Sequence, residues 1–447
     1  MKHLISAGCA LLLLGCSSSS VYQAPKPPSL AQEQYGYSAF TPDQWLSFSS
    51  LDLAFLLRQA FAQNWDVQVA AQRLQSAQLA LDLERANQGI SASGSLSASQ
   101  SSSSADVSHY YQHSESLSFS ARYEWDLWGK LQAQEDQAAL AASISEWDLE
   151  AAQISLTANL IRQYFSYLAT KERLAISRQN LASAQESLEL YDLQYDAGVV
   201  SKSDLLRQQS TILSLEERVE TLTLQQRDQQ RAIALLAGID EWVEQLPDTV
   251  LSDIVVPEIA LNQPAQLLRQ RPDLKAAKAN VRQAFLTSQV TQLERWPNLS
   301  ISLSLRPSDL YDLAEQWAIA LSESISMTLY DGGARTLNEQ RAAINERIAQ
   351  INYQSTVRTA LEEVKDSLSN YQQSLVSYRY QLASYDNLQQ QTDIIEYEWQ
   401  EGVSEKSDLI SAQRSLYSAE EALISNKLNV LQAITEIYQA NGTVPQL

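Results

Sequence analysis

The sequence predicts a mainly helical protein that also contains four membrane-spanning β-strands and repeats one structural plan twice. Only 12 Gly and 11 Pro punctuate the 447 residues, and the stretches 130–196 and 334–400 contain neither. A segment of alternating apolar and polar residues precedes each of these stretches. Scarce breakers predict long helices, whereas alternation predicts strands with one apolar face.

The first fifteen residues have the pattern of a signal peptide. Lys2 and His3 precede the apolar core LISAGCALLLLGC, which is too short for a transmembrane helix. Its end, Leu-Leu-Gly-Cys, is similar to the cleavage box of bacterial lipoproteins, so we expect cleavage before Cys16 and a covalent lipid on this residue. Removal of Cys9 would leave a single cysteine and hence no intramolecular disulfide. The alternative is an ordinary signal peptide in which Cys16 is incidental.

The residue after the cysteine and the following segment give two further expectations. Ser17, rather than Asp, favours sorting to the outer membrane in lipoproteins of this kind. Residues 16–50 are rich in Ser, Pro, Gln and Tyr and are predicted to form a lipidated extended linker. A single acyl chain anchors only marginally, so we expect a second membrane-inserted element.

An internal duplication is predicted from matched motifs in the same order. YDAGVVSKSDLLRQQ at 195–209 matches WQEGVSEKSDLISAQ at 399–413, and AFAQNWDVQVAAQRLQSA from Ala60 matches LLRQRPDLKAAKANVRQA from Leu267. Gly129 matches Gly333 after the alternating segments. The predicted organisation is a signal peptide (1–15), a linker (16–50), a first repeat (51–237), an inter-repeat linker (238–263), a second repeat (264–440) and a tail (441–447).

Each repeat is predicted to contain a long helical hairpin. The 67 residues of 130–196 or 334–400 are rich in good helix formers and would make a helix of roughly 100 Å. A helix of that length is typical of a coiled coil or a helical array. Shorter helices follow each glycine-containing turn, so every long helix doubles back. The expected partners are 201–237 and 404–440, and the expected entering helices are 51–87 and 264–294.

The alternating segments are predicted to form two strand pairs, within 90–128 and 297–330. Each strand has about ten residues, the length of a tilted transmembrane strand. Polar loops are expected within each pair, QSSSSADVSHYYQHSE in the first and RPSDLYDLAEQ in the second. His109 and His113, four residues apart, would lie in the first loop and are expected to be solvated rather than metal-binding.

Four strands are too few to close a barrel across a bilayer, and open sheet edges are not viable in lipid. The barrel is therefore expected to be shared between chains, with a Ser-rich watery lumen. Glu323 departs from the pattern, because it falls on the lipid side. The alternative is a soluble β-sandwich with one dry face. Amphipathic rings near strand ends favour the membrane interface; these are Trp125, Trp128, Trp296, Trp317 and Tyr330.

Several classes of function are excluded by composition and motifs. The net charge of -21, without a cluster of Lys and Arg, argues against nucleic acid as a partner. No phosphate loop, nucleophile elbow or Cys/His metal cluster occurs, so neither an enzyme nor a metal or organic cofactor is predicted. The paired Glu362 and Glu363 are expected to form a solvated face or inter-helix ion pairs.

Four motifs carry a resemblance to a known family: WDLWGK at 125–130, LYDGG at 329–333, RPDLKAA at 271–277, and the two Gly-x-x-x-Lys-Ser-Asp-Leu turns. Over nearly its whole mature length the chain resembles the TolC-type outer-membrane efflux proteins of Gram-negative bacteria, in particular their lipoprotein branch. The resemblance implies a homotrimer with a 12-stranded barrel in outer-membrane lipid and a periplasmic helical tunnel. It also implies a periplasmic adaptor and an inner-membrane transporter, expected to be proton-driven, as partners.

The resemblance also implies a periplasmic gate made of carboxylates one turn into the helices after each hairpin turn. Asp204 and Asp408 occupy these positions, and threefold symmetry would make a ring of each. For Asp204 a capping role with Ser201 is an equal alternative. At Asp408, where Glu405 replaces the serine, the gate role is favoured. Ser404 and Ser411 stand where some relatives have further gate residues, so the detail of those gates is not carried over.

The hairpin tips are implied to contact the adaptor, at Gly198 and Val199 in the first repeat and at Gly402 and Val403 in the second. Simple turn chemistry also accounts for the two glycines. The predicted function is the passive exit duct of a tripartite efflux pump for small toxic compounds. The alternatives are the duct of a type I protein-secretion system and a non-conducting coiled-coil or adaptor lipoprotein.

Overall fold

A computed structural model describes residues 22–25, 51–105, 108–239, 249–256, 259, 269–307 and 317–442, without the side chains of 51, 52 and 101–113. Cys16 and the loop between the second pair of strands lie outside the described residues. Contacts divide the chain into two compact units. Unit 1 comprises the described residues within 1–27, 73–145 and 276–354, and unit 2 comprises those within 28–72, 146–275 and 355–447. In the part of the chain described, no helix is long and apolar enough to cross a membrane.

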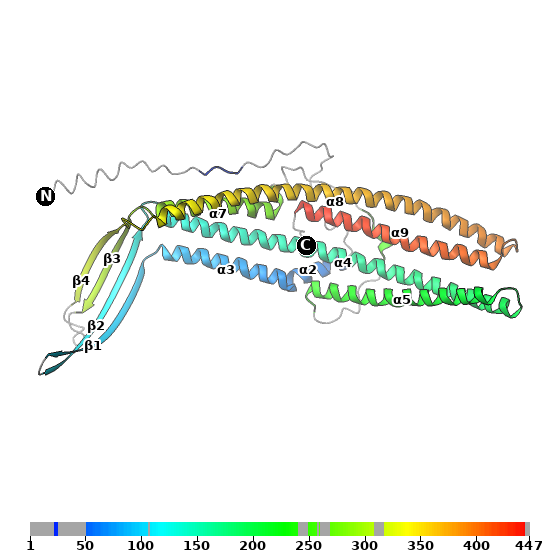
Figure 1. The fold of residues 1–447 in the computed structure, drawn as a ribbon, viewed down its shortest axis with the longest axis horizontal. Helices are drawn as coiled ribbons and strands as arrows, with labels where there is room; N and C mark the ends of the chain where they lie inside the picture. The colour runs from blue at the N-terminus through cyan, green and yellow to red at the C-terminus, as the bar shows by residue number, and fades with distance from the viewer. Residues whose placement is uncertain are drawn as a thin grey trace. The chain divides into compact units, whose positions relative to one another are not determined.

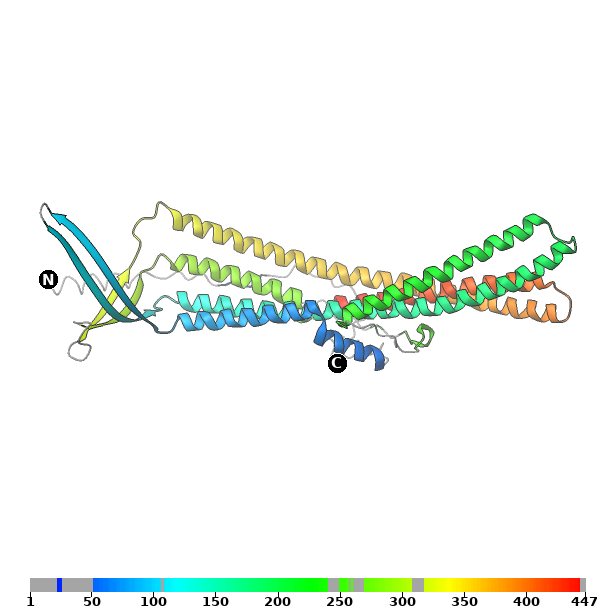
Figure 2. The same cartoon turned by 90° about the horizontal axis from the view of Figure 1, so that it is seen from below.

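The helices of the two hairpins begin and end close to the glycines that were expected to bound them, and Figure 1 shows their arrangement. The long helices α4 (Lys130–Asp196) and α8 (Ala334–Gln400) have the predicted bounds. They turn back into α5 (Lys202–Ala237) and α9 (Lys406–Asn441). Figures 1 and 2 both show α5 beside α4 and α9 beside α8 as antiparallel hairpins.

The entering helices differ from the prediction. In place of one helix over 51–87, α2 (Leu51–Gln63) and α3 (Trp65–Asn87) are separated at Asn64. The Asn64 side chain accepts hydrogen bonds from the amides of Asp66 (3.0 Å) and Val67 (3.3 Å) and thereby caps α3. In the second repeat α7 (Pro272–Leu293) begins after a break at Arg271, later than the predicted start at 264.

Four antiparallel strands form one sheet in the order β1-β2-β3-β4. They are β1 (Ser91–Ala105), β2 (Ser108–Trp125), β3 (Asn298–Pro307) and β4 (Trp317–Ser326). The expected loop over 100–115 is wrong, because Ser-rich strand continues to Ala105 and resumes at Ser108. β2 pairs with β3 only over 119–125, so the β1–β2 hairpin extends past β3 and β4 (Figure 1).

This correction moves His109 and His113 from a loop into β2. Residues four apart in a strand are separated by about 13 Å along it. The pair therefore lacks the i, i+4 proximity that a helix would provide for metal binding.

Each unit has its own apolar cluster. In unit 2 a large core joins α2, α4, α5, α9 and the short 3-10 helix η2 (Leu251–Asp253). The core includes Tyr164, Phe165 and Tyr438, whose side chains are fully buried. In unit 1 a smaller cluster contains Ala133, Phe285, Leu286 and Val290.

The inter-repeat linker is attached to unit 2 through Ser252. Glu172 of α4 accepts hydrogen bonds from the Ser252 amide and hydroxyl, both at 3.0 Å. Lys427 of α9 donates to the Ser252 carbonyl (2.6 Å), and burial lowers the pKa of this lysine. The described part of the linker is therefore fixed by polar contacts to two helices as well as by burial of Leu251.

Candidate functional site

The four strands have one apolar and one hydroxyl-rich face. One face carries rows of apolar residues in register, such as Phe119, Leu305 and Ile319. Glu323 pairs with Ile301 and lies on this face, as the sequence predicts. The other face carries cross-strand Ser–Ser hydrogen bonds at 2.7–2.9 Å, between residues 93 and 120, 95 and 118, 97 and 116, 99 and 114, and 300 and 324.

Four of the five predicted interface aromatics lie where the strands meet the helices, and Trp317 lies at the other end of β4. Trp128 and Trp296 stack with centroids 4.9 Å apart, and the Trp128 Nε1 donates to the carbonyl of Pro297 (2.7 Å). Tyr330, four residues after β4, is 89% exposed. Trp125 ends β2, whereas Trp317 begins β4 and lies near Phe119. The structure therefore places two rings in contact at the base of the sheet and separates Trp317 from them along β4.

Aspartates of two matched motifs cap the long helices. Asp126 Oδ2 accepts a hydrogen bond from the amide of Gln132 (2.9 Å) in the first turn of α4. Asp331 Oδ2 does the same for the amide of Arg335 (3.0 Å) in α8. A carboxylate at a helix N-terminus satisfies free amides and complements the helix dipole. These motifs therefore set where each strand gives way to a long helix.

At the opposite end of each long helix, the two hairpin turns share one backbone pattern. The amide of Gly198 donates to the carbonyl three residues earlier (2.9 Å), and that of Val199 to the carbonyl five residues earlier (2.8 Å). Gly402 and Val403 repeat these bonds at 3.0 and 2.8 Å. Both glycines have positive φ, 76° and 73°, as a Schellman helix end requires. The valines are 71% and 76% exposed, so each turn presents an apolar side chain to solvent.

A lysine packs over an aromatic ring beside each turn. Lys202 Nζ lies 5.1 Å from the ring centroid of Tyr195, and Lys406 Nζ lies 4.9 Å from that of Trp399. Lys406 also pairs with Glu186 of α4 (2.5 Å). Sequence reasoning missed these contacts, although the aromatic residue stands three before each glycine and the lysine four after it.

Asp204 is part of a complete capping box. The Asp204 amide donates a hydrogen bond to the Ser201 hydroxyl oxygen (3.2 Å). The Asp204 Oδ2 accepts hydrogen bonds from the Ser201 amide (3.3 Å) and hydroxyl (2.6 Å). Arg207 donates to Oδ1 (3.3 Å). The Ser201 hydrogen bonds lower the pKa of Asp204, so its stabilisation of the turn is complete at neutral pH. This stabilisation is lost only as the pH falls through the lowered pKa.

Asp408 is bound more loosely. Its Oδ2 accepts from the amide of Glu405 at 3.4 Å, and the side chain is exposed. It also lines a groove of about 380 Å³ between α8 and α9. The groove's hydroxyl-bearing residues are Thr392, Ser404, Ser411 and Ser415. Asp408 thus caps its helix while leaving more of its carboxylate free than Asp204 does.

Glu421 joins the two hairpins. Its Oε2 accepts from Arg218 of α5 (2.8 Å), and its Oε1 accepts from Ser177 of α4 (2.6 Å). Arg173 of α4 lies 3.8 Å from the same carboxylate, and its buried Nε has no hydrogen-bond partner. Burial and the neighbouring Arg218 lower the pKa of Arg173. One carboxylate therefore neutralises two guanidinium groups between α4, α5 and α9.

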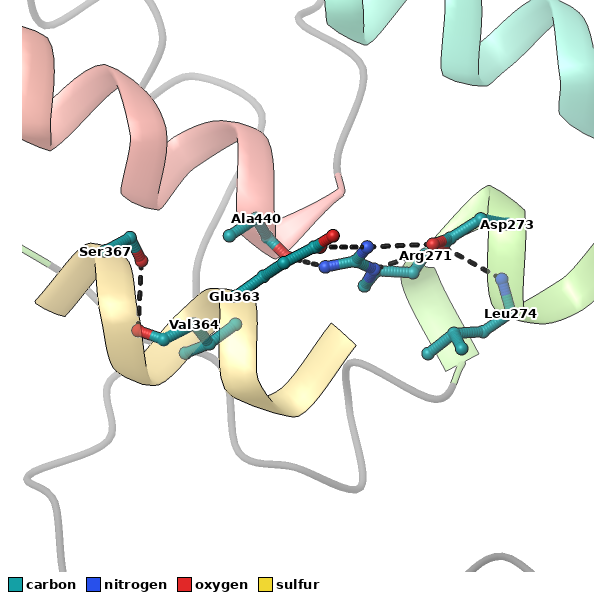
Figure 3. Close-up of polar contacts among 7 residues, drawn as sticks. All are labelled: Arg271, Asp273, Leu274, Glu363, Val364, Ser367 and Ala440. Atoms are coloured by element: carbon teal, nitrogen blue, oxygen red, sulfur yellow. Dashed lines mark hydrogen bonds and ion pairs between the residues drawn. The ribbon is translucent and has the colours of Figure 1, made fainter. Parts of the chain in front are cut away.

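The RPDL motif fixes the end of α9 (Figure 3). Arg271 is 8% exposed and forms two hydrogen bonds with Asp273 (2.8 and 3.1 Å) and one with Glu363 of α8 (2.7 Å). A fourth bond, of 2.9 Å, reaches the carbonyl of Ala440. A Cβ on Gly442 would lie 2.5 Å from Arg271 Cγ, so only glycine fits there. Glu363, which was expected to form a solvated face or an inter-helix ion pair, is half exposed and pairs with Arg271 just before α7.

The first repeat makes the equivalent contact with a neutral side chain. Asn64 Nδ2 donates to the carbonyl of Leu236 (3.0 Å), two residues before the helix-ending Gly238. Ala440 likewise precedes Gly442 by two residues. A Cβ on Gly238 would lie 2.6 Å from the Gln63 backbone. The duplication therefore extends to the way in which each hairpin's second helix is terminated.

Comparison with known proteins identifies the family. The family model described as "Outer membrane efflux protein" matches residues 56–239 and 264–443. The chain belongs to the outer membrane efflux protein family. This efflux protein is therefore an outer-membrane channel of the kind that works in tripartite pumps, not an enzyme, as the sequence predicts.

Relatives and solved structures agree with this assignment. The efflux protein is 30% identical over 323 residues to the pyoverdine export outer membrane protein OpmQ of Pseudomonas putida, covering 68% of this chain and 67% of that one. It is 24% identical to the outer membrane protein OprJ of Pseudomonas aeruginosa, covering 74% and 72%. The solved outer-membrane channel OprN has a TM-score of 0.83 at 24% identity, covering 96% of this chain and 99% of that one.

Membership confirms both the predicted fold class and the predicted family resemblance. The two matched stretches correspond to two family repeats, and the fold is that of TolC-like channels, with a helical part that lies in the periplasm. Pumps of this type imply an adaptor and an inner-membrane transporter as partners.

Among the described residues, no group of three or more His, Cys, Asp and Glu side chains could hold a metal ion.

Proposed function

We propose that three copies of this chain close one 12-stranded barrel and one helical tunnel, which form the passive exit duct of an efflux pump for small toxic compounds. The supporting observation is that the described sheet has four strands and ends at β1 and β4, each paired on one side only. Its apolar face suits lipid and its hydroxyl face suits a water-filled lumen. Because four antiparallel strands end with β4 opposite in direction to β1, copies can join edge to edge.

The lipid and the pump partners complete this proposal. Acylation of Cys16 would add a lipid anchor in the outer membrane. One acyl chain holds only marginally, so the inserted barrel would supply most of the attachment. The exposed valines at the two turns would bind the periplasmic adaptor, with a proton-driven transporter beyond it. The acidic surface gives no reason to expect a nucleic-acid partner. The aromatic rings near the strand ends would mark the membrane interfaces.

The carboxylates near the turns would line the closed inner end of the duct as two rings of three. Asp408 suits a gate better than Asp204 does, because its carboxylate is exposed and has only one long hydrogen bond. Asp204 is held by Ser201 and Arg207 and is first of all a cap. A ring of free carboxylates attracts cations and repels anions.

Single-channel recording in planar bilayers tests this proposal. We expect small, cation-selective currents from the wild type, and a fall of about threefold in the cation-to-anion permeability ratio with Asp408→Asn. Asp204→Asn should have a smaller effect. The matched control is Asp386→Asn, which removes an exposed carboxylate of α8 that lies more than ten residues before the hairpin turn. If both variants conduct with unchanged selectivity, the duct function stands but Asp204 and Asp408 act only as helix caps. If the wild type does not conduct, the duct function is contradicted.

A further inference from the structure

A groove in unit 2 is formed by three long helices and the inter-repeat linker. It has a volume of about 410 Å³ and lies between α4, α8, α9 and the described part of the linker. Its charged residues are Glu172 of α4 and Glu420 and Lys427 of α9. Its aromatic residues are Tyr378 and Tyr385, which are seven positions apart and therefore lie on the same side of α8. We refer to the cavity defined by these five residues as the Glu420 groove.

The carboxylate of Glu420 has no partner in the part of the chain that the structure describes. The side chain is half-buried, and no other described residue forms a hydrogen bond or ion pair with it. Burial raises the pKa of Glu420, and the nearby carboxylate of Glu172 acts in the same direction. By contrast, the adjacent Glu421 accepts hydrogen bonds from Arg218 and Ser177. Because a half-buried carboxylate without a cation is unfavourable, the Glu420 groove offers an unsatisfied site for positive charge.

The lysine of the groove is already bound to the linker. Among the described residues that line the groove, Lys427 is the one with a positive charge. Its Nζ donates to the carbonyl of Ser252 (2.6 Å), and the carboxylates near it are those of Glu172 and Asp253. The lining therefore carries one more negative than positive charge, and that charge lies at Glu420.

The tyrosines and aliphatic side chains make the site more than a negative charge. Burial raises the pKa of Tyr385, and the nearby carboxylate of Glu420 adds to this rise, so ring and carboxylate lie close together. The face of a tyrosine ring attracts cations. Ile176 of α4 and Leu423 of α9 add apolar surface to the lining. The volume falls within the range of small-molecule sites, and the lining matches a ligand with a positive head and an apolar body.

We propose that the Glu420 groove binds a small organic cation, an ammonium or guanidinium group on an apolar body, with Glu420 as its counter-ion. The head would donate hydrogen bonds to Glu420, and the body would lie along Tyr378 and Tyr385. A bare metal ion suits the groove less, because the described residues provide no group of three ligating side chains. The inference goes beyond the proposed function and does not depend on it, since a passive duct needs no ligand site.

Saturation-transfer NMR of the purified full-length protein, titrated with benzylamine, tests this inference. Benzyl alcohol has nearly the same size but no charge, and it should bind at least about tenfold more weakly. Glu420→Gln should weaken benzylamine binding about tenfold, and Tyr385→Leu about threefold. The matched control is Glu396→Gln, which removes an exposed carboxylate of α8 outside the groove and should leave the affinity unchanged.

Thermal unfolding shows whether the variants remain folded. Because Glu420 has no described partner to lose, Glu420→Gln should unfold at a temperature equal to or above that of the wild type. Loss of benzylamine binding in this variant, with the control unchanged, supports the site. Equal affinity of the wild type and Glu420→Gln, or equal weakening by Glu420→Gln and Glu396→Gln, would overturn it. Equal binding of benzylamine and benzyl alcohol by the wild type would also overturn it, and this comparison needs no variant.

Discussion

In the Arg271→Ala variant, the backbone amides of the last two turns of α9 are expected to exchange hydrogen about 100-fold faster than in the wild type. The guanidinium is buried and donates to Asp273, Glu363 and the carbonyl of Ala440. Its removal leaves that carbonyl buried without its partner and opens space beneath Gly442. Losses of this kind amount to about 3 kcal/mol, which corresponds to the expected change in exchange. Both carboxylates are partly exposed and can recover water, so the loss stays below that of a fully buried pair.

Two further variants define what Arg271 contributes. Arg271→Lys keeps the charge but not the two-pronged geometry, so its exchange should be intermediate. Lys275→Ala removes a half-buried lysine that pairs with Glu150 at 3.6 Å and should change little. Equal exchange at the end of α9 in Arg271→Ala and the wild type would show that the helix end is held by apolar packing alone.

In the Glu421→Gln variant, the two helical hairpins are expected to separate more readily and the channel to open more often. Glutamine keeps the size of the side chain and an oxygen for Ser177, but it leaves Arg173 and Arg218 facing each other without a carboxylate. We expect the attachment between the hairpins to weaken by about 2 kcal/mol per chain. The open probability in planar bilayers and the thermal unfolding temperature measure this change.

A double variant distinguishes electrostatic repulsion from lost packing. If repulsion between the arginines causes the effect, adding Arg218→Gln to Glu421→Gln should restore at least half of the loss, a coupling of about 1 kcal/mol. Glu217→Gln, an exposed glutamate next to Arg218, serves as the control. If the stability losses of Glu421→Gln and Arg218→Gln simply add in the double variant, Glu421 does not act by neutralising the two arginines.

The sequence predicts the long elements well because their ends depend on local chemistry. The limits of α4 and α8 follow from Gly129, Gly198, Gly333 and Gly402, whose backbone conformations favour glycine. The capping box at Asp204 is also local, and four consecutive residues were enough to give capping as one of the two roles expected for this residue. Alternation along the strands identifies which face of the sheet is apolar, including the exceptional Glu323.

Features that depend on distant residues were not predictable in the same way. The helix break at Asn64 is supported by a hydrogen bond to Leu236, 172 residues away. The continuation of β1 and β2 through a serine-rich stretch depends on pairing, since alternation is invisible where most residues are serine. In the sequence, Glu421 cannot be distinguished from a solvated glutamate of a long helix. Its role depends on the contact of α9 with α4 and α5.

Disulfide trapping between copies tests the shared barrel most directly. Neighbouring strands lie about 4.8 Å apart, close enough for a disulfide between facing cysteines. Cysteine at Ser93, Ser95 or Ser97 of β1 would be combined with Ser322→Cys in β4, and single-cysteine proteins would show the background. We predict that at least one pair gives covalent species that end at three chains. Linkage that continues past three chains, or none with any pair, would contradict a barrel shared by three copies.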